Sequence, residues 1–510
     1  MATAERAAGA RAPEQFARLR QLLAEAVDLG KVAGLLAWDQ RTHMPPAGAP
    51  ARAEQLGTVA RLAHERFVSD EIGELLEELR DYESSLERES YEASLIRTVR
   101  YDYEKERRVP AALRAEITRA GALGQSVWEK ARAESDFAAF LPYLERNVEL
   151  QREYVACFDP ADEDYDVLLD DYEPGTKTAE VRAVFERLKE DLVPLIEAIG
   201  DAEQLDDSFL RGSFPIAGQR AFEHEVLIAF GFDEESWRID ETVHPFAWNA
   251  SLADIRLTTR HREEDLHSVF ATMHEFGHGL YERGIDAALE RTPLARGVSL
   301  GLHESQSRMW ENLVGRSLAF WTRFFPRLRE TFPEQLGGVA LEDFYRGVNS
   351  VEPSLIRIEA DELTYNLHII LRFELEQEML SGSLALADLP DAWDARMKAY
   401  LGIDVPDVAD GCLQDTHWAG GAIGYFPTYS LGNVISVQIW ERARADLPDV
   451  EEQIARGDFA PLREWLREHV HRTGRMFLPG ETLERVVGGP IDPGPYVAYL
   501  RQKLGAVYGL

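Results

Sequence analysis

The string HEFGH holds the residues of this 510-residue chain whose types and spacing are best suited to chemistry. On a helix, His274 and His278 are four residues apart and project from one face, so their imidazoles can bind one metal ion. Glu275 is placed to accept a proton from a water whose pKa the metal lowers. A solvent-facing helix is the alternative, but the surrounding VFATMHEFGHGLYERG is otherwise largely apolar and predicts a buried one. The string therefore predicts a catalytic metal site, and zinc suits its donors.

A third protein ligand is expected from the helical stretch GLHESQSRMWENL. Glu304 is the preferred residue because a carboxylate from a later helix completes a two-histidine, one-glutamate set of the catalytic kind. Spacing alone leaves His303 and Glu311 open as alternatives. Glu311 shares a helical face with Glu304, so it is also a candidate to accept a hydrogen bond from His274 or His278 and orient it.

Two glycines, Gly277 and Gly279, lie in the same predicted helix. Each weakens a helix by about 1 kcal/mol, so their presence needs a reason. We expect them to let another backbone or the substrate approach the metal helix closely.

The elements that must position these residues are mostly helices. Apolar residues recur at helical spacing, as in Leu19, Leu22, Leu23 and Val27, and helical patterns dominate except near residues 237–260, where a small β-ribbon is expected. Three prolines between Trp38 and Arg52 predict an extended loop. The acidic stretch 159–176 predicts a surface connection between an N-terminal helical lobe, 1–158, and a catalytic helical lobe, 177–510.

Composition limits the partners. The chain has 45% hydrophobic residues, enough for a large core, and a net charge of −35, which repels phosphate groups and argues against nucleic acid or an anionic membrane as a partner. Two cysteines, Cys157 and Cys412, argue against a secreted disulfide framework. Because the N-terminal residues also lack the apolar core of a signal peptide, we expect a cytoplasmic protein.

The sequence resembles the M32 metallocarboxypeptidases over nearly its whole length. Six short motifs of that family occur in order: HPF at 244–246, DxRxT at 254–258, HExxH at 274–278, HES at 303–305, IRxxAD at 356–361 and GxxQDxHW at 411–418. The resemblance implies one unit over residues 1–510, mainly α-helical and two-lobed, with a deep substrate groove and a small sheet at its edge. It also implies a homodimer, zinc with cobalt as an alternative, and His274, His278 and Glu304 as ligands.

By the same resemblance, the activity is release of single residues from peptide C-termini, with tolerance for most side chains except proline. The resemblance also makes Glu275 the catalytic base. The developing oxyanion needs a donor, for which His417, Tyr425 and Tyr429 are candidates. A free carboxylate is best matched by a bidentate arginine.

Arg357 is the first candidate for that arginine and Arg256 the second, while His244 is expected to shape the groove wall. For Arg357 an ion pair with Glu359 or Asp361 is the structural alternative. Slow cleavage before acidic C-terminal residues is expected from the acidic surface.

Two other functions remain open at this point. An endopeptidase or dipeptidyl carboxypeptidase would use the same metal ligands, and a binding protein would keep the metal without turnover. The presence of Glu275 disfavours the binding protein.

Overall fold

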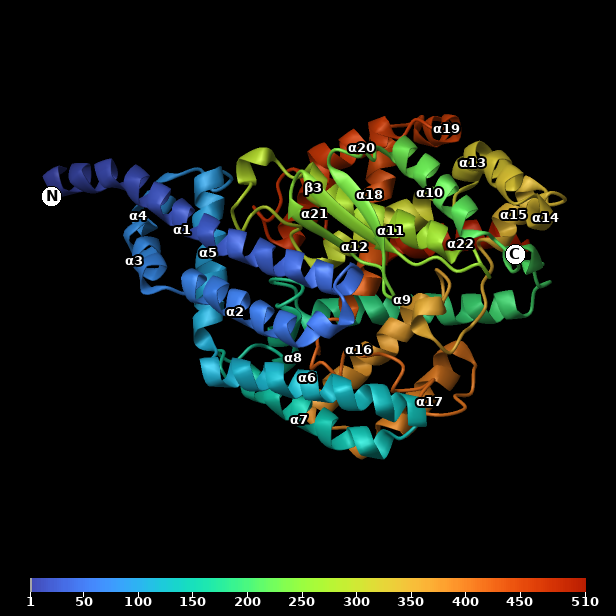
Figure 1. Ribbon diagram of the computed structural model, residues 1–510, viewed down its shortest axis with the longest axis horizontal. Helices are drawn as coiled ribbons and strands as arrows, with labels where there is room; N and C mark the ends of the chain where they lie inside the picture. The colour runs from blue at the N-terminus through green and yellow to red at the C-terminus, as the bar shows by residue number, and fades with distance from the viewer. Residues whose placement is uncertain (1) are drawn as a thin grey trace.

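The protein is mainly α-helical with one small sheet, as the sequence predicts. The structure is a computed structural model that describes the backbone of residues 2–510 and the side chains of residues 12–510. The blue and cyan helices of Figure 1 form its N-terminal third. They are α1 (Ala2–Thr42), α2 (Ala49–Phe67), α3 (Asp70–Glu78), α4 (Arg80–Ser85), α5 (Tyr91–Arg108), α6 (Ala111–Glu134) and α7 (Phe137–Val155).

The remaining helices carry the central and C-terminal parts of the chain. Before and around the metal helix lie α8 (Asp164–Leu169), α9 (Thr178–Gly200), α10 (Ile216–Phe230), α11 (His267–Gly284), α12 (Leu300–Arg308), α13 (Leu318–Thr331), α14 (Pro333–Leu336) and α15 (Leu341–Gly347). After them come α16 (Tyr365–Ser381), α17 (Leu389–Leu401), α18 (Pro427–Asp446), α19 (Val450–Arg456), α20 (Ala460–Leu466), α21 (Pro479–Val487) and α22 (Gly494–Tyr508).

Short helical turns of other kinds join these elements. Two are π-helical, η4 (Met309–Val314) and η7 (Arg467–His471). The 3-10 turns are η1 (Pro46–Gly48), η2 (Ser208–Leu210), η3 (Ala287–Leu289), η5 (Arg357–Glu359) and η6 (Leu386–Asp388).

The expected β-ribbon is a three-stranded sheet that packs on the metal helix. Its strands are β1 (Trp237–Glu241), β2 (Ala247–Ser251) and β3 (Asp254–Thr259), in the order β1-β3-β2. β1 runs parallel to β3, and β2 runs antiparallel to it. At Gly279 of α11 an added Cβ would collide with the side chains of Trp237 and Ile255. A close approach does occur at Gly279, but it is made by side chains of the sheet and not, as predicted, by another backbone or the substrate.

Two hydrophobic cores hold the chain together. The smaller core joins α1, α3 and α5 to residues that follow the metal helix, among them Ile285, Leu289, Leu294 and Ala295. The larger core contains most of the other buried apolar residues, from Val109 to Tyr508. Helices α6 and α7 contribute to the larger core. The division into lobes 1–158 and 177–510 remains a prediction.

The extended loop predicted between Trp38 and Arg52 is wrong. α1 continues to Thr42 and α2 begins at Ala49, so only a short connection with one 3-10 turn separates them. Pro46 begins that turn, and Pro50 lies in the first turn of α2. Proline is tolerated there because the first amides of a helix have no intrahelical acceptor.

The surface connection predicted for residues 159–176 is wrong from residue 164 onward, although residues 159–162 are exposed and form no helix or strand. Residues 164–169 form α8, and Tyr165, Leu168 and Leu169 are buried in the larger core. Glu173 is only 1% exposed. The acidic residues of this segment suggested an exposed connection, although the apolar residues among them are buried.

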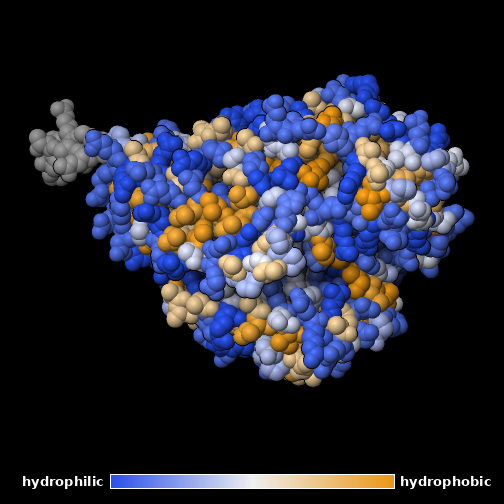
Figure 2. Space-filling model, in the orientation of Figure 1, coloured by the Kyte–Doolittle hydropathy of each residue, from blue (hydrophilic) through white to orange (hydrophobic). Residues whose placement is uncertain are grey.

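The surface is consistent with the high negative charge. Figure 2 shows a mostly hydrophilic face with separate hydrophobic patches. Among the described residues, no helix combines the length and apolar character needed to cross a membrane.

Candidate metal centre

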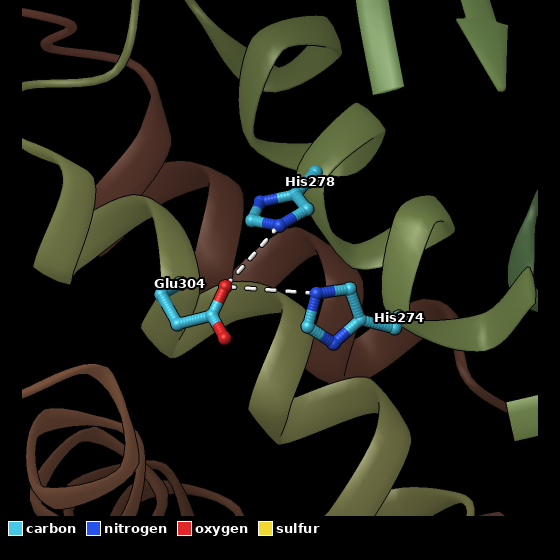
Figure 3. A group of neighbouring side chains, drawn as sticks. All are labelled: His274, His278 and Glu304. Atoms are coloured by element: carbon cyan, nitrogen blue, oxygen red, sulfur yellow. Dashed lines mark ion pairs between the residues drawn. The ribbon is translucent and has the colours of Figure 1, made fainter. Parts of the chain in front are cut away.

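Three side chains from two helices converge on one point. His274 and His278 project from α11, and Glu304 projects from α12 toward both of them (Figure 3). The Oε2 atom of Glu304 lies 3.6 Å from Nε2 of His274 and 3.4 Å from Nε2 of His278. The ligand atoms all lie within 4.8 Å of one another. We call these three residues the metal site, because two imidazoles and a carboxylate are a donor set that fits zinc and similar divalent ions.

Each imidazole is held from behind by a second group. Nδ1 of His274 hydrogen-bonds with Oε2 of Glu311 at 2.8 Å. Nδ1 of His278 lies 2.6 Å from Nδ1 of His303, whose Nε2 lies 2.9 Å from Glu282. These contacts direct both Nε2 atoms toward Glu304, the arrangement expected around a metal ligand. His303 and Glu311, the alternative third ligands, therefore lie behind the histidines.

Burial and nearby charges set the protonation of these groups. Burial lowers the pKa of His278 to about 4, so its imidazole is neutral at pH 7, the form that binds metal. Burial opposes ionisation of Glu304, yet the charges of Arg308 and His274 hold its pKa well below the usual range. Glu304 is therefore a carboxylate at every physiological pH.

Glu304 is fixed by its own helix and by α18. Nε of Arg308, one turn later, donates to Oε1 of Glu304 at 2.8 Å, and the Ser307 hydroxyl donates to Oε2 at 3.1 Å. From the other side Gly432 of α18 packs so closely that an added Cβ would lie 2.6 Å from Cβ of Glu304. The carboxylate has little room to leave the metal site.

Gly277 lets the two metal-site helices touch. A Cβ added there would lie 2.6 Å from the carbonyl oxygen of Gln306 and 2.7 Å from Cα of Ser307, both in α12. The expected close approach at Gly277 is thus made by another backbone. It brings Glu304 within reach of the histidines on α11.

Glu275 lies beside the metal site and is only 8% exposed. Burial raises the pKa of its carboxyl group to about 7, opposed by the charge of His274. A carboxyl group with this pKa is well suited to accept and return a proton near neutral pH.

A second buried ionic group adjoins the metal site. Arg357 of η5 and Arg372 of α16 share the carboxylate of Asp415, with N–O distances of 2.7 and 2.6 Å. We call these three residues the arginine cluster. The Asp415 partner corrects the alternative pairing of Arg357 with Glu359 or Asp361, because Asp361 instead accepts hydrogen bonds from Leu363 and Thr364.

Tyr365 connects the arginine cluster to the metal site. Its hydroxyl accepts a hydrogen bond from Nη1 of Arg357 at 2.8 Å. Its ring lies 4.5 Å from the guanidinium of Arg308, which holds Glu304. One aromatic side chain thus contacts both the arginine cluster and the arginine that holds the metal-site carboxylate.

The three predicted oxyanion donors gather beside the arginine cluster. Nε2 of His417 lies 3.3 Å from the hydroxyl of Tyr429, and the Tyr425 ring is 5.2 Å from each of these rings. Burial lowers the pKa of His417 to about 4, so it is neutral at pH 7. The Arg357 guanidinium lies 5.0 Å from the Tyr429 ring.

The other two predicted substrate residues lie around the sheet. Arg256 of β3 makes a bidentate pair with Asp254 and lies 4.4 Å from the Trp38 ring. His244 is exposed in the connection between β1 and β2. Neither makes a hydrogen bond or ion pair with the metal site within the described chain.

Several residues of this region were not predicted from the sequence. Arg308 follows Glu304 by four residues, a spacing that signals an ion pair on a helix and would have identified it. Asp415 and Arg372 carry no such signal, because Asp415 is separated from Arg357 by 58 residues and from Arg372 by 43. Glu282 could be found only through its contact with His303.

Comparisons with known proteins agree with this geometry. The family model of the carboxypeptidase Taq (M32) metallopeptidases matches residues 18–504. Thermostable carboxypeptidase 1 of Thermus thermophilus is 44% identical, covering 97% of this chain and 99% of the relative. Carboxypeptidase 1 of Bacillus subtilis is 37% identical, covering 93% of this chain and 95% of the relative.

A solved structure extends the agreement to the fold. The crystal structure of an M32 carboxypeptidase from Deinococcus radiodurans superposes with a TM-score of 0.94 at 43% identity, covering 98% of this chain and 100% of that one. The chain therefore belongs to the M32 family and is a metallocarboxypeptidase.

Proposed function

We propose that this protein releases single amino acids from peptide C-termini by metal-assisted hydrolysis, with broad side-chain tolerance that excludes proline. The observation that carries the proposal is the convergence of His274, His278 and Glu304 beside the buried Glu275. We assign zinc to the metal site, with cobalt as the alternative, because the donors are two imidazoles and one carboxylate. A divalent ion held there would polarise the scissile carbonyl and lower the pKa of the attacking water.

Glu275 is the general base of this proposal. It takes a proton from the attacking water as the oxygen bonds to the carbonyl carbon, and the carbonyl electrons move onto the oxygen. When the C–N bond breaks, Glu275 returns the proton to the leaving amine. A pKa of about 7 suits both transfers.

The arginine cluster is the proposed site for the substrate's terminal carboxylate. Two guanidinium groups share one carboxylate in it, which leaves one positive charge for an incoming anion. We prefer Arg357 to Arg256, because Tyr365 and Arg308 link Arg357 to the metal site, whereas Arg256 pairs with Asp254 beside the sheet. His417, Tyr425 and Tyr429 surround the same space and are the proposed oxyanion donors, while His244 is proposed to border the substrate groove.

The assembly and location that we propose are a cytoplasmic homodimer. Support comes from the two cysteines, which are free, and from the family resemblance. Native mass spectrometry would test the dimer directly.

The test of the proposed function is a time course by mass spectrometry on one unblocked peptide and its C-terminal amide. With the zinc-loaded protein we expect a one-residue ladder from the free acid only, lost after treatment with a chelator and restored by zinc or cobalt. Two-residue or internal cuts would replace the proposal with a dipeptidyl or endopeptidase activity. Bound metal without any cleavage would indicate a binding protein.

A further inference from the structure

A groove of about 690 Å³ lies between the N-terminal helices and the segment that enters α12. We call it the α1–α12 groove. The lining residues used below are Lys31, Tyr101, Tyr172, Glu282, Arg296 and His303. Because His303 hydrogen-bonds with His278, this groove reaches the immediate surroundings of the metal site.

Most of the charged groups in the α1–α12 groove are paired. Each has a partner among the described residues: Arg475 with Asp102, Lys105 with Asp170 and Asp171, His64 with Glu106, and Glu282 with His303. The Lys31 ammonium donates to the backbone and side-chain oxygens of Asn249 at 3.0 and 2.8 Å. These contacts account for the groove's other cations.

Arg296 differs from these residues. Its guanidinium is exposed to the α1–α12 groove and makes no hydrogen bond or ion pair with any side chain or carbonyl among residues 12–510. The surrounding walls lower the pKa of Arg296 to about 10, so the group is still fully charged at pH 7. The charges of Asp102 and Glu282 act on Arg296 from a distance, but the group faces the cavity without a direct ion-pair partner.

The backbone that carries Arg296 is fixed on both sides. The Arg296 amide donates to the carbonyl of Leu294 at 2.9 Å, and the Gly297 amide donates to Oε1 of Glu282 at 3.0 Å. The Leu294 carbonyl also accepts from the Arg475 amide at 3.0 Å. The side chain of Arg296 is thus presented from a rigid segment, which reduces the entropy lost when it binds a ligand.

The α1–α12 groove and the arginine cluster lie on two sides of the same aromatic contact. Tyr172 lines the groove, and its ring is 5.1 Å from Tyr425 in an edge-on arrangement. Tyr425 in turn packs on Tyr429, beside Arg357. Two aromatic rings, those of Tyr425 and Tyr429, thus lie between Tyr172 of the groove and Arg357, and our inference places the residues before the scissile bond in the α1–α12 groove.

We propose that Arg296 is a specificity-determining residue that binds an aspartate or glutamate side chain of the peptide upstream of the scissile bond. The inference rests on the proposed carboxypeptidase function. A carboxylate matches the planar guanidinium and supplies the direct ion-pair partner that Arg296 lacks. The net charge of −35 acts against acidic peptides at long range, but salt screens it beyond about 8 Å, whereas a direct contact is screened less.

The test uses N-acetylated heptapeptides of alanine and serine that end in leucine. Glutamate or glutamine is placed in turn at each of five positions before the scissile bond, and the initial rate of leucine release gives kcat/KM. At one position we expect the wild-type protein to prefer glutamate over glutamine by roughly tenfold, the size of one charge-assisted contact. The ratio should fall to about one in Arg296→Gln and recover in part in Arg296→Lys.

Arg291→Gln is the matched control. Arg291 lies in the same connection but pairs with Asp28 at the surface, so the variant makes the same change in net charge without touching the groove. We expect it to keep the wild-type ratio. An Arg296 that only offset the charge of Glu282 would change the rates on both peptides equally.

The outcomes separate this inference from the function on which it depends. If the wild-type protein releases leucine but shows no glutamate preference at any position, or if Arg296→Gln keeps that preference, the inference is wrong and the function stands. If the protein releases no leucine even from the glutamine peptides, the proposed function fails, and the inference fails with it.

Discussion

The metal site and the arginine cluster are adjacent and buried, yet their charges are unbalanced in opposite directions. Around the metal site three carboxyl groups, those of Glu304, Glu311 and Glu275, outnumber the two adjacent guanidinium groups, those of Arg308 and Arg316. In the arginine cluster two guanidinium groups share the single carboxylate of Asp415. An uncompensated buried charge is costly, so each group is completed by a ligand of the opposite sign. The first therefore suits a metal cation and the second a substrate carboxylate.

Glu275→Gln should have the largest effect and tests the metal-site half of this comparison. The amide keeps the shape of the side chain but cannot accept the proton, so we expect kcat to fall roughly 10²–10⁴-fold. Metal content, measured by atomic emission, should stay at the wild-type level, because Glu275 is not a ligand. A variant that turns over at the wild-type rate would remove Glu275 from the mechanism.

Arg357→Gln tests the other half. Loss of the guanidinium should lower kcat/KM for free-acid peptides by roughly 10²–10³-fold, the usual cost of truncating one partner of a buried charged contact. The rate on the C-terminal amide should change much less, so the ratio of acid to amide rates should approach one. Arg256→Gln is the control and should keep the wild-type ratio. If Arg256→Gln abolished the ratio and Arg357→Gln kept it, the assignments of the two arginines would be exchanged.

Glu173 extends the comparison of buried charges, because it is a buried carboxyl group that has no arginine as an ion-pair partner. Burial raises its pKa from 4.5 to about 7, although the Gly301 amide of α12 donates to it. Since the folded-state pKa is the higher one, the wild-type protein loses stability as the pH rises from about 4.5 through 7. Glu173→Gln should remove this loss, gaining about 3 kcal/mol relative to wild type across that range.

Chemical denaturation at pH 4.5 and pH 7.5 measures this difference. This loss of stability with rising pH is opposite in sign to the change expected for Glu304 and Asp415, because their arginine partners lower the pKa of each carboxyl group. A difference between variant and wild type that is the same at both pH values would show that folding does not raise the pKa of Glu173.

Gly277→Ala should have the smallest effect and tests how closely the metal-site helices pack. The new Cβ would lie 2.6 Å from the Gln306 carbonyl oxygen, so α11 and α12 must move apart. We expect a loss of roughly 1–3 kcal/mol in the free energy of unfolding and weaker metal binding. Gly57→Ala, in α2 with open space around it, is the control and should gain about 0.5–1 kcal/mol. Equal stability changes would show that the helices adjust freely.

The metal site was the part of the structure that could best be predicted from the sequence. The i, i+4 spacing on one helix fixes how His274 and His278 face each other, whatever the rest of the fold. The position of Glu304 needed the chemistry of the ligand set and the family motifs, because nothing in the spacing shows how α11 and α12 pack. Gly277 and Gly279 indicated close approaches, but the partners of these glycines were set by tertiary structure.

The arginine cluster and the role of Arg296 could not be predicted from the sequence, for physical reasons. Asp415 meets Arg357 through irregular segments, and such segments have no periodicity from which a side-chain direction follows. Arg296 is distinguished by the partner it lacks, which only the assembled groove reveals. The buried α8 was missed because its acidic residues mask the apolar ones that pack inward.

The two hydrophobic cores meet at the connection that carries Arg296. Leu294 and Ala295 belong to the smaller core, whereas Val298 and Leu302 belong to the larger one. The α1–α12 groove is lined from both sides of this seam, by Lys31 and Tyr101 on one and by Tyr172 and His303 on the other. A peptide bound there as we propose would touch both cores at once, so its binding free energy would also oppose their separation. Substrate occupancy and the cohesion of the N-terminal helices would then be thermodynamically linked.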